Sequence, residues 1–191
     1  MKLVRYGETG REKPGLLDAG GKLRDHSAAI DDLGGPVLRP EGLAKLKALD
    51  PAKLPLVSGS PRLGVPVTGI GKIVAIGLNY SDHAAESNLP VPKEPIIFFK
   101  TTSSLSGPSD PVVIPKGSEK SDWEVELAVV IGKPAAYVSE AEALSHVAGY
   151  LICNDVSERA YQIERGGTWD KGKGCDTFCP LGPWLVTGGE I

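Results

Sequence analysis

Glycine and proline interrupt this chain at short intervals, which disfavours a bundle of long helices. The 191 residues include 24 glycines and 16 prolines, roughly a fifth of the chain against an average near 12%. The glycines have no period of three, which excludes collagen, and no apolar run approaches the ~18 residues of a membrane-spanning helix. The 41% of apolar residues suffice for a core. The length fits one domain or a domain with a small appendage.

Charge and cysteine usage narrow the class of protein further. The formal net charge is −3 and there is no run of lysine or arginine, so the footprint of a nucleic-acid binder is missing. The first residues lack the apolar core of a signal peptide. Cys153, Cys175 and Cys179 form no Cys-x-x-Cys pair and have no histidine at zinc-ligand spacing. We expect free thiols in a reducing cytoplasm, and neither nucleic acid nor membrane as partner.

The first 66 residues indicate a small N-terminal α+β domain that ends in a connector. Residues Lys2–Tyr6 alternate like a short strand, and Gly20-Gly21 is typical of a hairpin turn. Pro40 starts a predicted helix, and the residues from Pro51 to Pro66 are typical of a connector.

Residues 67–191 are predicted to form a second, β-rich domain. The pattern of apolar residues predicts strands at 73–76, 96–100, 122–131, 150–155 and 181–186, the first two buried on both faces. Residues 79–88 could hold one helical turn, and residues 156–165 a helix or turn. The capping box at Ser139 and Glu142 predicts a helix that ends at Gly149. The fold class is therefore α+β and rich in β-structure.

The predicted strand 122–131 carries two carboxylates on one face. Residues two apart in a strand share a face, so Glu124 and Glu126 point the same way. The opposite face is expected to meet the core through Trp123, Val125, Leu127, Val129 and Ile131. A solvated edge would also explain two glutamates, but Ala128 and Val130 make the rest of their face apolar. A buried carboxylate pair requires a cation, and Mg²⁺ or Mn²⁺ suits oxygen ligands.

A third carboxylate stands at the end of another apolar strand. Asp155 follows residues 150–154, although it could equally cap the segment that starts at Val156. Together with Glu124 and Glu126 it would complete an all-oxygen site, which disfavours zinc.

Two further groups of residues could take part in catalysis or in substrate binding. One helical turn would place His83 and Glu86 on one face, where the carboxylate raises the basicity of the imidazole and the pair can deprotonate water. A surface histidine beside a glutamate would have the same spacing. A further set of residues follows Asp155: Arg159, Gln162, Trp169, Lys171, Lys173 and Thr177. The cationic and amide groups among them could bind a substrate carboxylate.

In combination these motifs resemble the fumarylacetoacetate hydrolase family over about residues 70–189. The resemblance rests on Gly77-Leu-Asn-Tyr-x-x-His83-x-x-Glu86, on Pro95-x-x-Phe-Phe-Lys100, on Asp122-x-Glu124-x-Glu126 and on Asn154-Asp155-Val-Ser-x-Arg159-x-x-Gln162. Residues 1–66 resemble the small leading domain of bacterial members that act on sugar-acid intermediates.

The resemblance implies a mixed β-roll or barrel-like sheet around a divalent metal. Mg²⁺ is expected, with Mn²⁺ or Ca²⁺ as alternatives, on Glu124, Glu126 and Asp155. The resemblance makes His83 and Glu86 a water-activating dyad on a lid and gives Lys173 the role of steadying an enolate. It places Arg159, Gln162 and Thr177 at supporting substrate positions. Family members continue past this sequence with further strands, so the catalytic domain is expected to be incomplete at its C-terminus.

The function implied by the resemblance is hydrolysis of the C3–C4 bond of a 2,4-dioxo acid. A 2,4-diketo-3-deoxy sugar acid would give pyruvate and a small hydroxy acid, and the enzyme would be a homodimer. Alternatives within the family are a 2-oxo-3-deoxy sugar-acid dehydratase, an acylpyruvate hydrolase and an oxaloacetate decarboxylase. An inactive metal-binding module is the alternative that is not an enzyme.

Overall fold

The computed structural model describes residues 1–86 and 88–190 and is built around a seven-stranded sheet. The strands lie in the order β3-β2-β1-β11-β9-β8, and β6 pairs separately with β11. All these pairs are antiparallel except β6 with β11. The strands are β1 (Lys2–Tyr6), β2 (Lys13–Leu17), β3 (Leu23–Asp25), β6 (Leu105–Ser106), β8 (Val125–Ile131), β9 (Val147–Asn154) and β11 (Cys179–Thr187).

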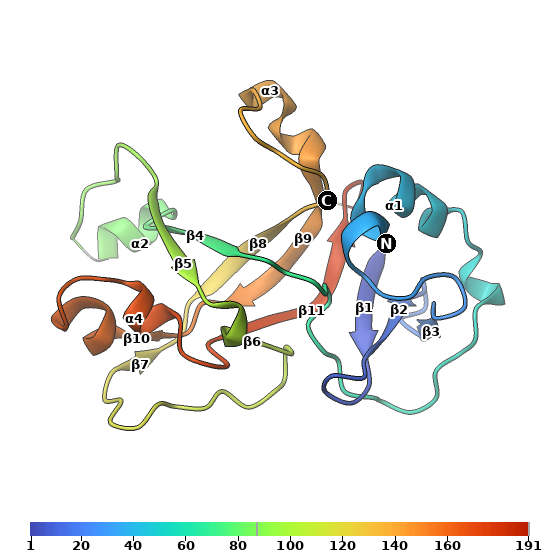
Figure 1. Ribbon diagram of the computed structural model, residues 1–191, viewed down its shortest axis with the longest axis horizontal. Helices are drawn as coiled ribbons and strands as arrows, with labels where there is room; N and C mark the ends of the chain where they lie inside the picture. The colour runs from blue at the N-terminus through green and yellow to red at the C-terminus, as the bar shows by residue number, and fades with distance from the viewer. Residues whose placement is uncertain (87, 191) are drawn as a thin grey trace.

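Among the described residues, two small sheets and four short α-helices surround this sheet. The small sheets pair β4 (Ile73–Gly77) with β5 (Ile96–Lys100), and β7 (Ser121–Asp122) with β10 (Ser157–Glu158). The helices are α1 (Pro40–Lys47), α2 (Ser81–Glu86), α3 (Glu140–Ala143) and α4 (Asp170–Lys173). Figure 1 shows α2 and α4 at the same end of the molecule as β4 and β5, whereas α1 lies at the other end with β1–β3. None of the described helices is long and apolar enough to cross a bilayer.

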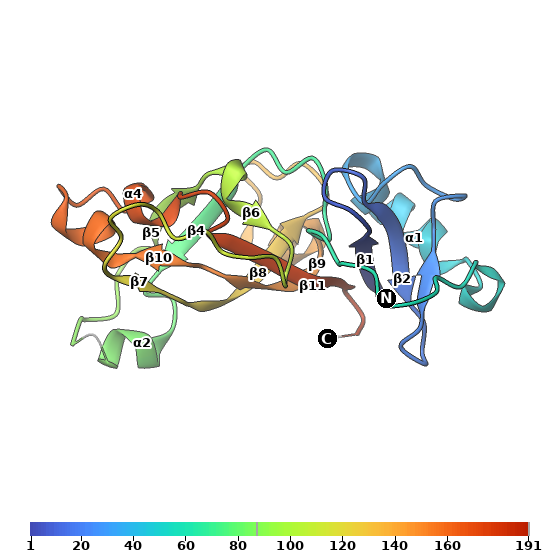
Figure 2. The ribbon, with the colours of Figure 1, turned by 90° about the horizontal axis from the view of Figure 1, so that it is seen from below.

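The sheet is continuous across the predicted boundary between the two domains. Strand β1 pairs with β11 through Lys2 opposite Val186 and Leu3 opposite Leu185, and Figure 2 shows β1 and β2 extending the line of β11, β9 and β8. The boundary at residue 66 therefore stays a prediction. The core beneath the sheet draws on both segments: Leu3, Leu16, Leu33, Leu38, Leu46, Val67, Ala148, Leu151, Cys153, Cys179, Leu181 and Leu185.

Most predicted elements are confirmed. The hairpin turn closes β2 on β3, helix α1 starts at Pro40, and one helical turn forms within residues 79–88. Residues 156–165 are split between β10 and a π-helix at Ala160–Glu164.

The helix predicted from Ser139 to Gly149 is wrong in length. The capping box forms, but α3 ends at Ala143 and a 3-10 turn follows over Leu144–His146. Strand β9 begins at Val147 because its backbone pairs with Ile131 of β8. Tertiary pairing here overrides local helix preference.

The prediction of which face of β8 meets the core is also wrong. The alternation is present, but Trp123, Val125, Leu127, Val129 and Ile131 are exposed, whereas Ala128 and Val130 pack on the core. Trp123 and Glu124 lie between β7 and β8 and not within one strand. Strands β4 and β5 likewise expose Val74, Ile76, Ile97 and Phe99, so they are covered on one face only. Alternation identifies two faces, but distant segments decide which of them is covered.

Candidate active site

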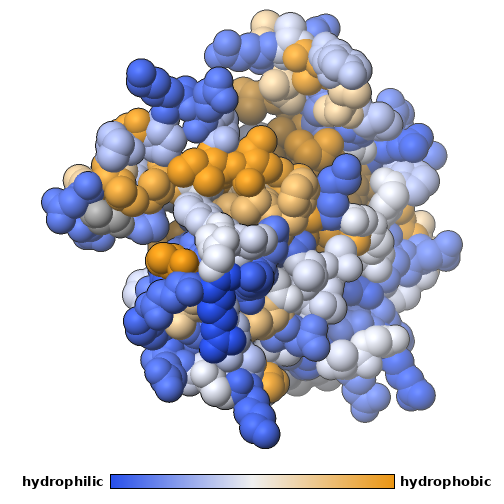
Figure 3. Space-filling view, turned by 60° about the vertical axis from the view of Figure 1, so that its left-hand side comes forward, coloured by the Kyte–Doolittle hydropathy of each residue, from blue (hydrophilic) through white to orange (hydrophobic). Residues whose placement is uncertain are grey.

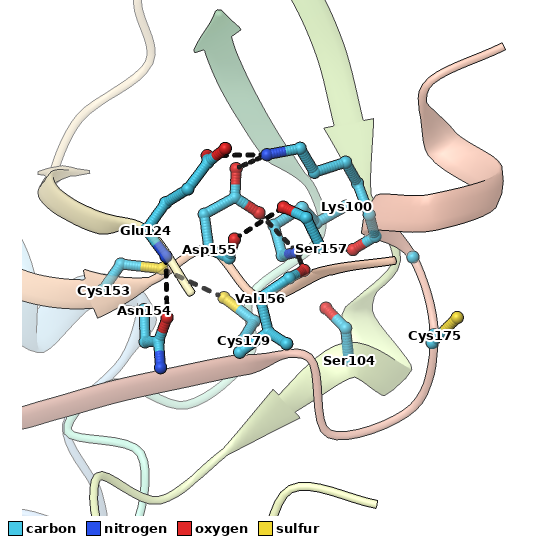
Figure 4. Close-up of polar contacts among 12 residues, drawn as sticks. Lys100, Ser104, Glu124, Cys153, Asn154, Asp155, Val156, Ser157, Cys175 and Cys179 are labelled. Carbon is cyan, nitrogen blue, oxygen red and sulfur yellow. Dashed lines mark hydrogen bonds and ion pairs between the residues drawn. The ribbon is translucent and has the colours of Figure 1, made fainter. Parts of the chain in front are cut away.

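Glu124, Asp155 and Lys173 form a buried ion cluster where β9 ends. Asp155 follows β9 directly and is 4% exposed, and Lys173 is the last residue of α4 and is 1% exposed. The Lys173 Nζ lies 2.7 Å from Glu124 Oε2 and 2.9 Å from Asp155 Oδ2. Figure 4 shows the two carboxylates turned toward the same point, Glu124 from the residue before β8 and Asp155 from the residue after β9. The structure therefore brings together three residues that the sequence predicted for the site.

Lys100 joins this cluster and was assigned no role from the sequence. It ends β5, is 4% exposed, and places its Nζ 2.6 Å from Asp155 Oδ1. The sequence feature that could have identified Lys100 is its position at the end of the apolar residues 96–99. A lysine buried there is stable only with an oppositely charged or hydrogen-bonding partner.

Arg159 links the ion cluster to Asp122 and Gln162. One guanidinium nitrogen lies 2.5 Å from Glu124 Oε1 and another 2.9 Å from Asp122 Oδ2. The Gln162 side chain, which is buried, accepts a hydrogen bond from Arg159 at 3.3 Å. Burial opposes the charge of Arg159, but Asp122 and Glu124 outweigh it and raise the pKa of the guanidinium. Arg159 and Gln162 thus border the cluster, and their role in substrate binding stays a prediction.

Glu126 has a different environment from Glu124. Its carboxylate makes no ion pair within the described residues, and its Oε2 accepts a hydrogen bond of 3.4 Å from Asn79 Nδ2. Burial raises the pKa of Glu126, and the negative charges of Glu124 and Asp155 raise it further. The ion pairs join three cations, Lys100, Lys173 and Arg159, to three carboxylates, Asp122, Glu124 and Asp155, and Glu126 stands outside them.

Helix α2 carries His83 and Glu86 and is attached to this region by the residues that precede it. Asn79 donates to Glu126, and the Tyr80 hydroxyl accepts a hydrogen bond of 3.3 Å from the backbone N–H of Leu127 on β8. His83 is half-buried and Glu86 is exposed. The described residues supply neither side chain with a hydrogen bond, so the dyad and its role stay a prediction.

Thr177 lies outside the ion cluster. Its Oγ1 accepts a hydrogen bond of 2.8 Å from the backbone N–H of Val113, which ties the loop before β7 to the turn before β11. Trp169 packs against Phe98 with ring centroids 5.5 Å apart. Lys171 is exposed and donates to the Arg165 carbonyl at 2.6 Å. A substrate-binding role for Thr177 stays a prediction.

The donor chemistry of the site fits a hard divalent cation. Carboxylate oxygens are the ligands such ions take, and among the described residues Glu126 is a carboxylate with no cationic side chain paired to it. Within residues 1–86 and 88–190, however, no three acidic, histidine or cysteine side chains are placed to share one ion. The Lys173 ammonium lies between Glu124 and Asp155. The three predicted metal ligands therefore do not converge on one position in this structure.

The fold and the site define a β-rich scaffold with a polar, charged centre at strand ends, and comparisons identify its family. The model of the fumarylacetoacetate (FAA) hydrolase C-terminal family matches residues 72–191. A protein of Burkholderia multivorans named "Putative hydrolase" is 65% identical over all 191 residues, which span 68% of its own length. The chain belongs to the fumarylacetoacetate hydrolase family.

Solved structures show the same fold. The fumarylacetoacetate hydrolase of Exiguobacterium antarcticum is 30% identical with a TM-score of 0.78, over 98% of this chain and 66% of that one. A 5-carboxymethyl-2-hydroxymuconate delta-isomerase from Mycobacterium smegmatis is 31% identical with a TM-score of 0.70, over the same two shares.

Proposed function

We propose that this protein is a Mg²⁺-dependent hydrolase that cleaves the C3–C4 bond of a 2,4-dioxo acid and releases pyruvate. The observation that supports the proposal is the buried Lys173 held between Glu124 and Asp155, because a fixed ammonium beside carboxylates suits an enolate formed next to a bound cation. The proposed substrate is a 2,4-diketo-3-deoxy sugar acid, with a small hydroxy acid as second product. That preference rests on the resemblance of residues 1–66 alone.

Glu124, Glu126 and Asp155 would hold the metal, which when bound supplies a Lewis acid for the 1-carboxylate and 2-oxo groups. His83, oriented by Glu86, takes a proton from water, and the resulting hydroxide adds to the C4 carbonyl. The C3–C4 bond then breaks and its electron pair passes to C3 as the pyruvate enolate. Lys173 stabilises that enolate until the proton on His83 returns to C3. One water is consumed, and the products are pyruvate and a carboxylic acid.

A coupled pyruvate assay on the full-length protein tests this proposal. A panel of acylpyruvates and 2,4-dioxo-3-deoxy sugar acids is supplied with Mg²⁺, with a chelator as the matched blank. We expect pyruvate from at least one substrate, and a loss of about 10²-fold or more in kcat for Lys173→Met, the typical effect of removing one group that stabilises an oxyanion. Absence of pyruvate from every substrate would rule the hydrolase out. If a chelator then lowered the melting temperature, the inactive metal-binding module would be favoured.

A 5-carboxymethyl-2-hydroxymuconate delta-isomerase is the second candidate, because the Mycobacterium smegmatis relative carries that name. Such a reaction moves a proton and cleaves no carbon–carbon bond, so it needs no water nucleophile. NMR analysis of products separates it from the hydrolase, from a sugar-acid dehydratase and from an oxaloacetate decarboxylase. Substitution Glu86→Ala should slow the hydrolase most.

We further propose that the full-length protein acts as a homodimer in the cytoplasm. The three cysteines carry free thiols, which suits a reducing compartment. Sedimentation equilibrium of the full-length protein tests the dimer, and a monomer at micromolar concentration would contradict it.

A further inference from the structure

We infer that Lys100 is a positioning residue that holds Asp155 and the Lys173-bearing end of α4 in one fixed geometry. The inference rests on the proposed function for its catalytic meaning, but its structural part can be tested without any substrate. Lys100 itself has no free donor with which to bind a substrate, as its contacts show.

All three N–H groups of the Lys100 ammonium are used inside the protein. They are donated to Asp155 Oδ1 at 2.6 Å, to the Val156 carbonyl at 3.2 Å and to the Lys173 carbonyl. A lysine ammonium has three donors and no acceptor, so its capacity is filled. Because the side chain is 4% exposed, water does not replace these bonds. Lys100 therefore acts through its neighbours and not on the reacting atoms.

The two oxygens of the Asp155 carboxylate are bound by different lysines. Oδ1 is bound by Lys100 and Oδ2 by Lys173, which fixes the rotation of the carboxylate about its terminal bond. The Lys173 carbonyl belongs to the last turn of α4, where carbonyl groups lack partners within the helix. A single ammonium thus joins the end of β9 to the end of α4.

The neighbours of Lys100 show that the end of β5 is attached to α4 at three successive residues. The backbone N–H of Phe99 donates to Asp170 Oδ1 at 2.8 Å, and Thr101 Oγ1 donates to the Gly174 carbonyl at 2.8 Å. Of the three, Lys100 alone also contacts Asp155. Thr101→Val is therefore a matched control, since it removes one bond between β5 and α4 and leaves the ion cluster intact.

The test compares Lys100→Met, Lys100→Arg and Thr101→Val in the full-length protein. The first measurement is reductive methylation of lysines with formaldehyde and borohydride, read at each lysine by peptide mass spectrometry. In the wild type Lys173 is protected because it is 1% exposed. We expect Lys100→Met to raise the methylation rate of Lys173 by about tenfold or more, and Thr101→Val to change it less than about threefold. Circular dichroism and protection of Cys153 and Cys179 from maleimide confirm that each variant is folded.

The second measurement is steady-state kinetics on whichever substrate the wild type turns over. Small displacements of a catalytic group cost about 10²-fold, so kcat should fall by about that factor in Lys100→Met while KM changes by less than about threefold. Lys100→Arg keeps the charge, but its planar guanidinium cannot place one nitrogen on three acceptors. We expect it to fold and still to lose most of kcat, which covers the case in which Lys100→Met fails to fold.

Three results would overturn the inference. They are unchanged protection of Lys173 in a folded Lys100→Met, an equal effect of Thr101→Val, or wild-type behaviour of Lys100→Arg. If the wild type releases no pyruvate, the proposed function fails, whereas the methylation pattern still decides the role of Lys100.

Discussion

At Glu126 the requirements of stability and of metal binding oppose each other. Burial beside Glu124 and Asp155 raises the pKa of Glu126 above that of an unfolded glutamate. The folded state then holds the proton more tightly than the unfolded state, so this group contributes less stability as the pH rises. We expect Glu126→Gln to raise the free energy of unfolding of metal-free protein at pH 7 by about 1 kcal/mol, a typical size for one substitution.

Urea unfolding in the presence of a chelator measures this gain, which should vanish below the ordinary glutamate pKa. Stabilisation by added Mg²⁺ should be lost in the same variant. Glu124→Gln is the control: it breaks the ion pairs with Lys173 and Arg159 and should destabilise the protein. Equal destabilisation by both substitutions would contradict the expectation.

We expect His26 to make the fold sensitive to mild acid. Its side chain is fully buried, and neither ring nitrogen has a hydrogen-bond partner in the part of the chain that the structure describes. Burial lowers the pKa of His26, and the opposing effect of Asp25 is smaller. A lowered histidine pKa means that stability is present at neutral pH and is lost as the pH falls below about 6.5, where the unfolded histidine takes up a proton.

We therefore expect the free energy of unfolding to decrease between pH 8 and pH 5.5. His26→Leu should remove much of that decrease without loss of stability at pH 8, because it also removes unpaired polar atoms from the interior. Urea unfolding at pH 5.5, 7 and 8 checks both statements. An unchanged slope in His26→Leu would assign the decrease to other groups.

At the scale of elements, local patterns predicted the positions of strands but not their surroundings. The Lys2–Tyr6 strand and the helix from Pro40 depend on nearby residues and are confirmed. The early end of α3 depends on pairing between β8 and β9 and could not be read locally. Lys100 was missed for the same reason, since its partners Asp155 and Lys173 stand 55 and 73 positions away.

The junction between β4 and α2 offers a test of packing between elements. A Cβ on Gly77 would lie 2.5 Å from Trp169 Cζ3, which is closer than atoms can approach. We expect Gly77→Ala to cost about 1–3 kcal/mol of unfolding free energy, as overpacked cores do. The cost should shrink when Trp169 is replaced by leucine, which a double-mutant cycle measures. Independent, additive costs would show that Trp169 is not the obstacle.

For the whole molecule, the most informative failure of prediction concerns which surface is apolar. Val125, Leu127 and Val129 of β8 are exposed beside Ile152 of β9, and the outer face of β4 and β5 is apolar as well. Figure 3 shows a continuous area of hydrophobic side chains on the side where that hairpin lies. The composition suggested enough apolar residues for a core, yet many large apolar side chains lie on the surface and outside that core.

This face should control association of the 191-residue chain when it is expressed by itself. Exposed contiguous apolar surface binds dyes such as anilinonaphthalene sulfonate and promotes aggregation. We expect the double variant Leu127→Thr and Val129→Thr to lower dye fluorescence and to slow aggregation, while the unfolding free energy shifts by no more than about 0.5 kcal/mol per site. The control is Leu151→Thr on the covered face of β9, which is 4% exposed and should cost several times more. If the double variant destabilised the chain as strongly as the control does, the outer face of β8 would be part of a core and not a free surface.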